Sequence, residues 1–180
     1  MKKYIAILRG INVSGQKLMK MAELKTYLKD LNFNNVITYI QSGNISFESG
    51  SSNQKEMEAQ IGNKIKEKYD FEVPIIVKSA EEMKRIAENN PFLNDRQEDS
   101  SKLSVTFLAD EPDIELVNKF RTINYAPDEF IVVEKVLYGF VPVSYGNTKF
   151  SNNFIESKLK TTATTRNCKT VLKLLEMVGD

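Results

Sequence analysis

Residues 36–47 read VITYIQSGNISF and give the clearest indication of the fold. Val36 to Ile40 and Ile45 to Phe47 are short runs of β-branched and aromatic residues, which favour strands. The residues between them include Ser42, Gly43 and Asn44, and Gly and Asn tolerate the backbone conformations of a tight turn. The stretch therefore predicts a β-hairpin.

The segments on either side of the hairpin complete a known pattern. Before it, YIAIL at residues 4–8 predicts a buried strand, and the apolar spacing across residues 17–31 predicts an amphipathic helix. After it, residues 57–65 repeat apolar side chains at helical spacing, and VPIIV at 73–77 predicts a strand with Pro74 at its start or on an edge. The order β-α-β-β-α-β over about residues 3–78 predicts a ferredoxin-like lobe with an antiparallel sheet.

The second half of the chain partly echoes this order. Ser79, with Glu82 three residues later, predicts a capped helix that ends before Pro91. Residues 103–180 then predict β-α-β-β-α, in which Thr164 to Asn167 precede and cap the last helix. We therefore expect an α+β protein of two packed lobes: an N-terminal ferredoxin-like lobe, 1–78, and a C-terminal α+β lobe, 79–180, with a partly similar order and terminal helices.

The composition excludes several classes of protein. The chain has 180 residues, of which 41% are hydrophobic, with one Cys and no His. It therefore has no internal disulfide, no Ser-His-Asp triad and no zinc site of the usual kind. No segment is apolar and long enough to cross a bilayer, and we expect a cytoplasmic protein with no membrane partner, cofactor or metal.

The charges are segregated along the chain although the net charge is only +1. Residues 1–29 hold seven basic residues and one acidic residue, and residues 149–173 hold six and one. Residues 30–148 hold twelve basic and twenty acidic residues. Such asymmetry points to an anionic partner for the basic ends, although the lysines could also merely solvate helix surfaces.

Two polar segments of the N-terminal half are candidate binding sites. Arg9 and Asn12 follow the first predicted strand directly, where α/β and α+β proteins often hold ligands, and Arg9 can donate two N–H groups to a phosphate or carboxylate. Ser42 and Asn44 offer further donors and acceptors at the hairpin turn. For all four residues, the alternative is a role in shaping the turn or, for Arg9, in an ion pair.

A third candidate lies before the last helix. Thr165 and Asn167 can cap this helix, and a helix N-terminus with Arg166 beside it attracts anions. Capping alone would also explain the segment. Cys168 follows, but a lone cysteine is more often an inert core residue than a nucleophile. No catalytic residue can be assigned from these patterns.

Four stretches together resemble a known family. They are LRGINVSG at 8–15, TYIQSGNISF at 38–47, NPF at 90–92 and TTRNCKTVLKL at 164–174. In this order they resemble the bacterial domain-of-unknown-function family 1697 over essentially the whole chain. The resemblance implies a cytoplasmic α+β protein of two lobes and implies no activity. Members usually have a glycine in place of Ser14 and often an aromatic residue in place of Cys168.

These observations leave three functions open. The first is binding of a small anionic or phosphorylated ligand at the basic polar residues. The second is an enzyme on a small anionic substrate, whose acid or base would not be His. The third is a protein or RNA interaction module. The lobe order is that of RNA-recognition sheets, with Tyr4 and Phe47 on the comparable strands, but the RNA-recognition signature is absent.

Overall fold

The N-terminal sheet has the predicted ferredoxin-like topology. The structure is a computed structural model that describes residues 1–143 and 148–179. Its first sheet has the order β2-β3-β1-β4, and every neighbouring pair is antiparallel. The strands are β1 (Lys2–Leu8), β2 (Asn34–Tyr39), β3 (Asn44–Ser49) and β4 (Ile75–Ser79). The order β-α-β-β-α-β and the antiparallel sheet are therefore confirmed.

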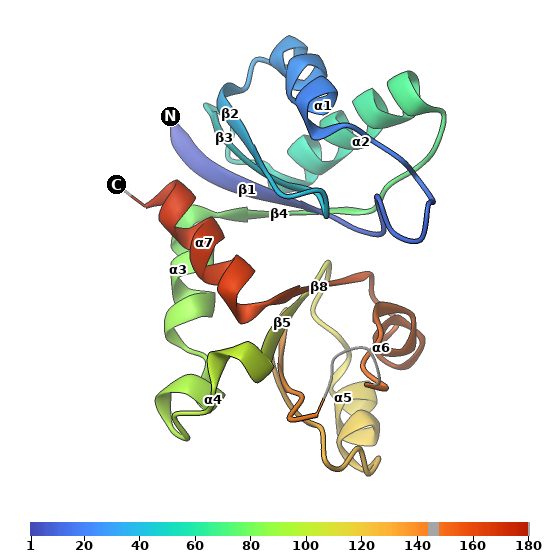
Figure 1. Cartoon of the computed structure of the whole chain (residues 1–180), viewed down its shortest axis with the longest axis vertical. Coiled ribbons are helices and arrows are strands. Elements are labelled where there is room, and N and C mark those ends of the chain that lie inside the picture. The colour runs from blue at the N-terminus through green and yellow to red at the C-terminus, as the bar shows by residue number, and fades with distance from the viewer. Residues whose placement is uncertain (144–147, 180) are drawn as a thin grey trace. The chain divides into compact units, whose positions relative to one another are not determined.

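Two helices cover one face of this sheet (Figure 1). They are α1 (Met21–Leu28), which continues as a short 3-10 turn η1 (Lys29–Leu31), and α2 (Gln54–Tyr69). Their apolar side chains, such as Leu24 and Ile61, pack with Ala6 and Ile45 of the sheet. Burial of this apolar surface is the main force that holds the sheet and helices together. Pro74 directly precedes β4, which is an edge strand, as predicted.

The first helix is shorter than predicted. Residues 17–20 lie outside it, because Lys17 has a left-handed φ of 46° and Lys20 is extended, with φ −81° and ψ 119°. The apolar spacing from Met21 onward is helical as expected, but the segment before it forms a loop. This loop joins β1 to α1 and contains one of the candidate sites.

The second sheet repeats the topology of the first. Its order is β6-β7-β5-β8, again antiparallel throughout. The strands are β5 (Leu103–Leu108), β6 (Glu129–Val133), β7 (Val136–Phe140) and β8 (Ala163–Asn167). The helices α5 (Ile114–Arg121) and α6 (Asn152–Leu159) pack on one of its faces. The second lobe is thus also ferredoxin-like, and it resembles the first lobe more closely than its sequence predicts.

The strand β8 corrects the prediction for residues 164–167. These residues were expected to form only the segment that precedes the last helix, yet they pair with β5 from Ser104 to Leu108. Threonine-rich ATTRN is compatible with a strand, and its pairing completes the sheet. The expected helix follows at once as α7 (Cys168–Val178).

The remaining helices connect these elements. They are α3 (Ala80–Glu88), α4 (Pro91–Asn94) and the short 3-10 turn η2 (Ser100–Lys102). The predicted capping box is present, because Glu82 N–H donates to Ser79 Oγ at 3.2 Å and Ser79 N–H donates to the Glu82 carboxylate at 2.8 Å. By internal contacts the chain forms two units, one of residues 1–84 with the C-terminal residues from Leu174, the other Arg85–Lys173.

Candidate functional site

The first two candidate motifs lie side by side at one end of the N-terminal sheet. The Leu8 N–H donates to the Gly43 carbonyl at 2.8 Å, and the Arg9 N–H donates to the Pro74 carbonyl at 3.0 Å. In the strand register, Ile7 faces Asn44. The end of β1, the β2–β3 turn and the residue before β4 therefore meet at this end of the sheet, with half-buried Arg9 among them. We call this end of the strands the N-terminal sheet edge.

Gly43 lets the two motifs approach closely. Its φ is +81°, and a Cβ atom there would lie 2.6 Å from Cδ1 of Ile11 and 2.8 Å from Cβ of Leu8. No L-residue fits such a space without displacement of the LRGIN segment. The glycine in the β2–β3 turn is therefore required by contact with the loop after β1, in addition to its role in the turn.

Asn12 fastens the loop after β1 to the hairpin. Its side-chain amide donates to the carbonyls of Met19 at 2.9 Å and Gln41 at 2.8 Å, and its Oδ1 accepts from the Met19 N–H at 2.8 Å. Asn12 has a left-handed φ of 54°, which Asn tolerates better than most residues. Since both of its amide hydrogens are used within the chain, Asn12 positions the loop.

Asn44 and Ser42 close the hairpin turn. The Asn44 amide donates to the Tyr39 carbonyl at 3.1 Å and to Ser42 Oγ at 3.3 Å. Asn44 is completely buried, whereas Ser42 is half-buried. Of the four N-terminal candidates, Arg9 and Ser42 are thus partly open to solvent, while Asn12 and Asn44 hold the backbone around them.

Left-handed backbone conformations are concentrated at this sheet edge. Among the described residues, ten non-glycine residues and three glycines have a positive φ. All three glycines and four of the ten fall in the two contacting segments; they are Gly10, Asn12, Ser14, Gly15, Lys17, Ile40 and Gly43. Ile40, with φ 50°, is β-branched, for which this conformation is an outlier. Such conformations tend to cluster at binding sites, where the surrounding structure enforces them.

The third motif is divided between the two faces of the second sheet. On one face, the Thr165 hydroxyl donates to Asn152 Oδ1 at 2.7 Å and shares a 2.8 Å hydrogen bond with the Thr106 hydroxyl. Because side chains alternate along a strand, Arg166 points to the opposite face, beside its register partner Val105. The expected cluster of Thr165 and Arg166 at a helix terminus is therefore not formed.

Arg166 is a buried cation. The residue is only 9% exposed. One terminal nitrogen of its guanidinium donates to Thr164 Oγ1 at 3.1 Å and to the Thr165 carbonyl at 2.9 Å. Burial lowers the pKa of the Arg166 guanidinium to about 10, so the group stays charged at neutral pH. A charge held at this depth is uncommon and marks Arg166 as a candidate for anion binding.

The residues after Arg166 have structural roles. Asn167 Oδ1 accepts from the Thr170 N–H at 2.7 Å, which is the N-cap bond of α7. Cys168 is buried, and burial raises the pKa of its thiol. The thiol is therefore a core group, as the simpler reading of a lone cysteine expects.

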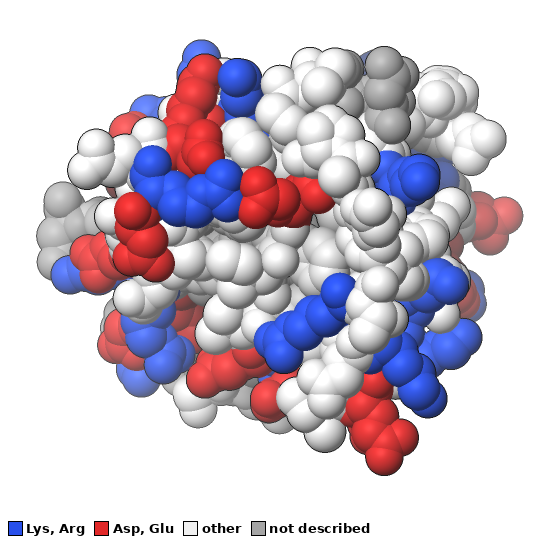
Figure 2. All heavy atoms as spheres, turned by 90° about the horizontal axis from the view of Figure 1, so that it is seen from below, with Lys and Arg blue, Asp and Glu red and all other residues white. Residues whose placement is uncertain are grey.

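The candidates fall into two groups, one in each unit. Arg9, Asn12, Ser42 and Asn44 are brought together at the N-terminal sheet edge. Thr165 to Asn167 are consecutive on β8. That one ligand is shared by Arg9, Asn44 and Arg166 stays a prediction. The face in Figure 2 carries both basic and acidic side chains, with basic ones gathered at the lower right of the view and mixed signs at the left.

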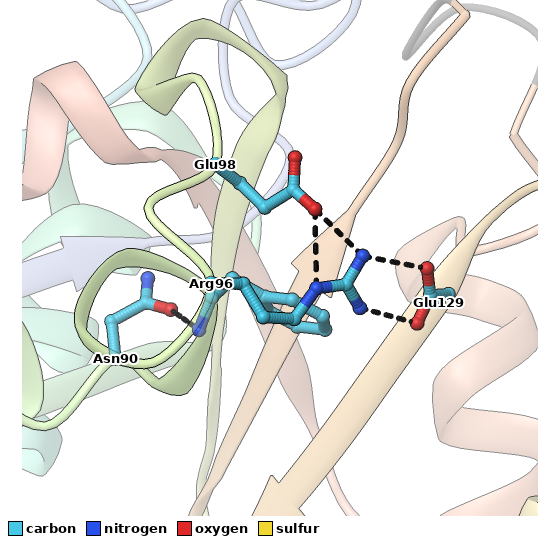
Figure 3. Close-up of polar contacts among 5 residues, drawn as sticks. Asn90, Arg96, Glu98 and Glu129 are labelled. Atoms are coloured by element: carbon cyan, nitrogen blue, oxygen red, sulfur yellow. Dashed lines mark hydrogen bonds and ion pairs between the residues drawn. The ribbon is translucent and has the colours of Figure 1, made fainter.

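Arg96 is the centre of a charged cluster that the sequence patterns do not indicate. Its guanidinium bridges Glu129, at 2.6 and 3.1 Å, and Glu98, at 2.6 and 3.1 Å (Figure 3). It also lies 5.3 Å from the ring centres of Phe92 and Phe140. Glu129 and Glu98 raise the pKa of Arg96 above its already high value, so it is a permanently charged link between the α4 segment and β6.

The NPF motif supports this link. Asn90 Oδ1 accepts from the Phe92 N–H at 3.1 Å, Pro91 starts α4, and the buried Phe92 ring stacks on Phe140 at 5.9 Å. Phe92 is followed four positions later by Arg96, just past the end of α4, and this spacing is the sequence signal that could have indicated the contact.

The two aromatic residues compared with RNA-binding sheets are core residues. Tyr4 and Phe47 are 2% and 1% exposed and lie 5.8 Å apart between the sheet and its helices. These rings are therefore not exposed for stacking on bases.

The described residues lack two kinds of feature. Over 1–143 and 148–179, no three His, Cys, Asp or Glu side chains gather in a way that could hold a metal ion. In the same residues, none of the helices combines the length and the apolar character that a membrane span needs.

Comparison with known proteins agrees with the motifs. The structure is similar to that of the conserved bacterial protein SP0830 from Streptococcus pneumoniae, with a TM-score of 0.73 and 26% sequence identity over 98% of each chain. No curated protein matches the chain. The model of the family described as "Protein of unknown function (DUF1697)" matches residues 1–138. The chain therefore belongs to the DUF1697 family.

Proposed function

We propose that this protein binds a small anionic ligand, such as a phosphorylated metabolite, at the N-terminal sheet edge beside Arg9. The concentration of left-handed residues in the segments 10–17 and 40–43 carries this proposal. Two segments far apart in sequence are held against each other in conformations that most side chains avoid, and the Asn12 amide fixes their contact. Strain of this kind persists where a binding site needs a defined shape.

The residues have distinct roles in this proposal. Arg9 binds the anion, because its fork of N–H donors matches the geometry of a phosphate or carboxylate. The half-buried Ser42 hydroxyl supplies a further donor, while Asn12 and Asn44 hold the loop and turn that surround it. The basic residues near Arg9 add a favourable field, since the only acidic residue among positions 1–29 is Glu23.

Arg166, in the second unit, is a further candidate for anion binding. Its buried charge would be stabilised by an anion more strongly than an exposed charge, because the surrounding dielectric constant is lower. Thr165 and Asn167 support it indirectly, by fixing β8 and the start of α7.

Thermal unfolding in different salts tests the proposal. Phosphate, sulfate and a nucleoside monophosphate should raise the melting temperature more than chloride at equal ionic strength, because a ligand that binds only the folded state stabilises it. Arg9→Ala should abolish this difference, and Arg9→Lys should retain part of it. Lys25→Ala, which removes an exposed lysine of α1, is the matched control and should respond as the wild type does.

Equal melting temperatures in all these salts would contradict the proposal. So would an unchanged response in both Arg9→Ala and Arg166→Lys. Isothermal titration of the best anion gives the affinity, and incubation of the same anion with the protein distinguishes simple binding from the alternative, an enzyme that converts it.

A further inference from the structure

Three exposed aliphatic side chains surround Asn12. Its hydrogen bonds join residues 12, 19 and 41, and a neighbour of each has an exposed side chain. These neighbours are Val13, Leu18 and Ile40, at 57%, 66% and 48% exposure. One amide holds residues 12, 19 and 41 together, so the three exposed side chains belong to neighbouring residues of one loop and turn region.

Two lysines flank these side chains. Lys17 and Lys20 lie next to Leu18 on the same loop, and Lys20 has 82% of its side chain exposed, with a 3.3 Å ion pair to Glu23. We call Val13, Leu18, Ile40, Lys17 and Lys20 the basic patch. Aliphatic side chains that project from a basic loop are typical of surfaces that dock an acidic, partly apolar partner.

The start of α5 has the complementary composition. Ile114 is 65% exposed, and Glu111, Asp113 and Glu115 around it are exposed as well. Asp113 caps the helix through a 2.7 Å bond from the Glu115 N–H. Within the described part of the chain, none of these three carboxylates forms an ion pair with Lys or Arg. We call Glu111, Asp113, Ile114 and Glu115 the acidic patch.

We propose that the basic patch of one chain docks on the acidic patch of a second copy. Each patch exposes aliphatic surface to water, and contact would bury both surfaces while it pairs charges of opposite sign. The two patches differ, so the contact is heterologous, and copies associate head to tail. The basic patch shares the segments 10–17 and 40–43 with the proposed anion site. Arg9 belongs to neither patch, so Arg9→Ala tests the anion site and Leu18→Glu tests the docking.

Mass measurement over a range of concentrations tests the association. Light scattering after size exclusion, or sedimentation equilibrium, should show a mass that rises above 20.5 kDa with concentration and falls with added salt. Leu18→Glu and Ile114→Ser should each return the protein to a monomer, with the dissociation constant raised at least about tenfold. Val143→Ser, which changes a 77% exposed side chain outside both patches, should leave the mass unchanged.

A mixture of the two variants gives the sharpest result. Leu18→Glu keeps an intact acidic patch and Ile114→Ser keeps an intact basic patch, so an equimolar mixture should form a dimer and nothing larger. A wild-type chain that stays monomeric up to millimolar concentration would overturn the inference. It would also be overturned if the wild type associates and both variants associate equally well. Circular dichroism melting of each variant separates loss of docking from loss of folding.

Discussion

The side-chain amide of Asn12 donates a 2.8 Å hydrogen bond to the backbone carbonyl of Gln41. This bond joins the loop after β1 to the β2–β3 turn, two segments separated by almost thirty residues. A second bond from the same amide, to Met19, holds the far side of the loop. One side chain thus defines the shape of the sheet edge where the anion site is proposed.

Replacement of Asn12 should destabilise the protein for two reasons, lost hydrogen bonds and backbone strain, and two variants separate them. Asn12→Gly keeps the left-handed φ of 54° but loses three hydrogen bonds, two part-buried and worth about 1 kcal/mol each, and the exposed one to Gln41, worth less. Asn12→Ala loses the same bonds and adds the strain of a Cβ atom at positive φ, about 1 kcal/mol more. Denaturation by urea measures both, and equal stability of the two variants would contradict the role of the backbone conformation.

Replacement of Ser14 by glycine should stabilise the protein. Ser14 has a φ of 51°, a conformation that L-residues adopt at a cost of about 1 kcal/mol. Glycine removes that strain but adds freedom to the unfolded chain, so we expect a net gain of about 0.5 kcal/mol. Thermal unfolding should show a slightly higher midpoint. The neighbouring Gly15→Ala, at φ +73°, should lower it, and a rise in that variant would refute the argument.

The sequence was sufficient for most of the fold. Runs such as YIAIL and LSVTFL, with helical spacing between them, located seven of the eight strands named here and the helices that cover the sheets. The strand β8 was missed because Asn167 gives a strong helix-cap signal, and ATTRN has few large apolar residues. Its pairing with β5 depends on a sheet formed sixty residues earlier, which no local pattern shows.

The candidate site was predictable only in part. The polar motifs were visible, but the contact that brings Arg9 next to Gly43 follows from strand order and from the close approach to Ile11. Because side chains alternate between the two faces along β8, Thr165 and Arg166 point to opposite faces. A loop would not have imposed this separation. The charged contacts of Arg96 could not be predicted, because its partner Glu129 lies more than thirty residues away.

Loss of the hydroxyl should change the free energy of unfolding differently at two tyrosines, Tyr125 and Tyr138. Among the described residues, the Tyr125 hydroxyl has no hydrogen-bond partner and is buried near the rings of Phe120, Phe130 and Phe150. Tyr125→Phe removes an unsatisfied group, so the free energy of unfolding should stay unchanged or rise by about 1 kcal/mol. In Tyr138 the hydroxyl donates to the Ile86 carbonyl at 3.0 Å, so Tyr138→Phe should lower the free energy of unfolding by about 1 kcal/mol.

Chemical denaturation of both variants measures this difference. Each substitution removes one oxygen atom from a buried ring, which makes the pair a matched comparison. A larger loss of stability in Tyr125→Phe than in Tyr138→Phe would show that the Tyr125 hydroxyl has a partner in solution. The direction of the difference is therefore the decisive result, whatever its size.

Glu82 should make stability depend on pH below neutrality. Burial by itself would raise the pKa of Glu82, but the Ser79 N–H and the Lys78 ammonium stabilise the carboxylate more, and the net pKa lies below its usual value. Gln54 also donates to this carboxylate. A lowered folded-state pKa gives stability that is present above the unfolded value, about 4.3, and is lost as pH falls through the folded value.

Glu82→Gln removes that contribution and leaves the ammonium of Lys78, only 6% exposed, without its carboxylate 3.5 Å away. Because the Glu82 side chain is 24% exposed, solvent screens part of the loss, and we expect a decrease of about 1–2 kcal/mol at pH 7. The difference from wild type should shrink as the pH falls below about 4, where the wild-type carboxylate is protonated as well.

The double variant Lys78→Met with Glu82→Gln should recover stability relative to Glu82→Gln, because it no longer buries an unpaired charge. Urea denaturation at several pH values measures all three proteins. A difference between wild type and Glu82→Gln that is constant with pH would show that the carboxylate's charge has no part in the stability of the α3 cap.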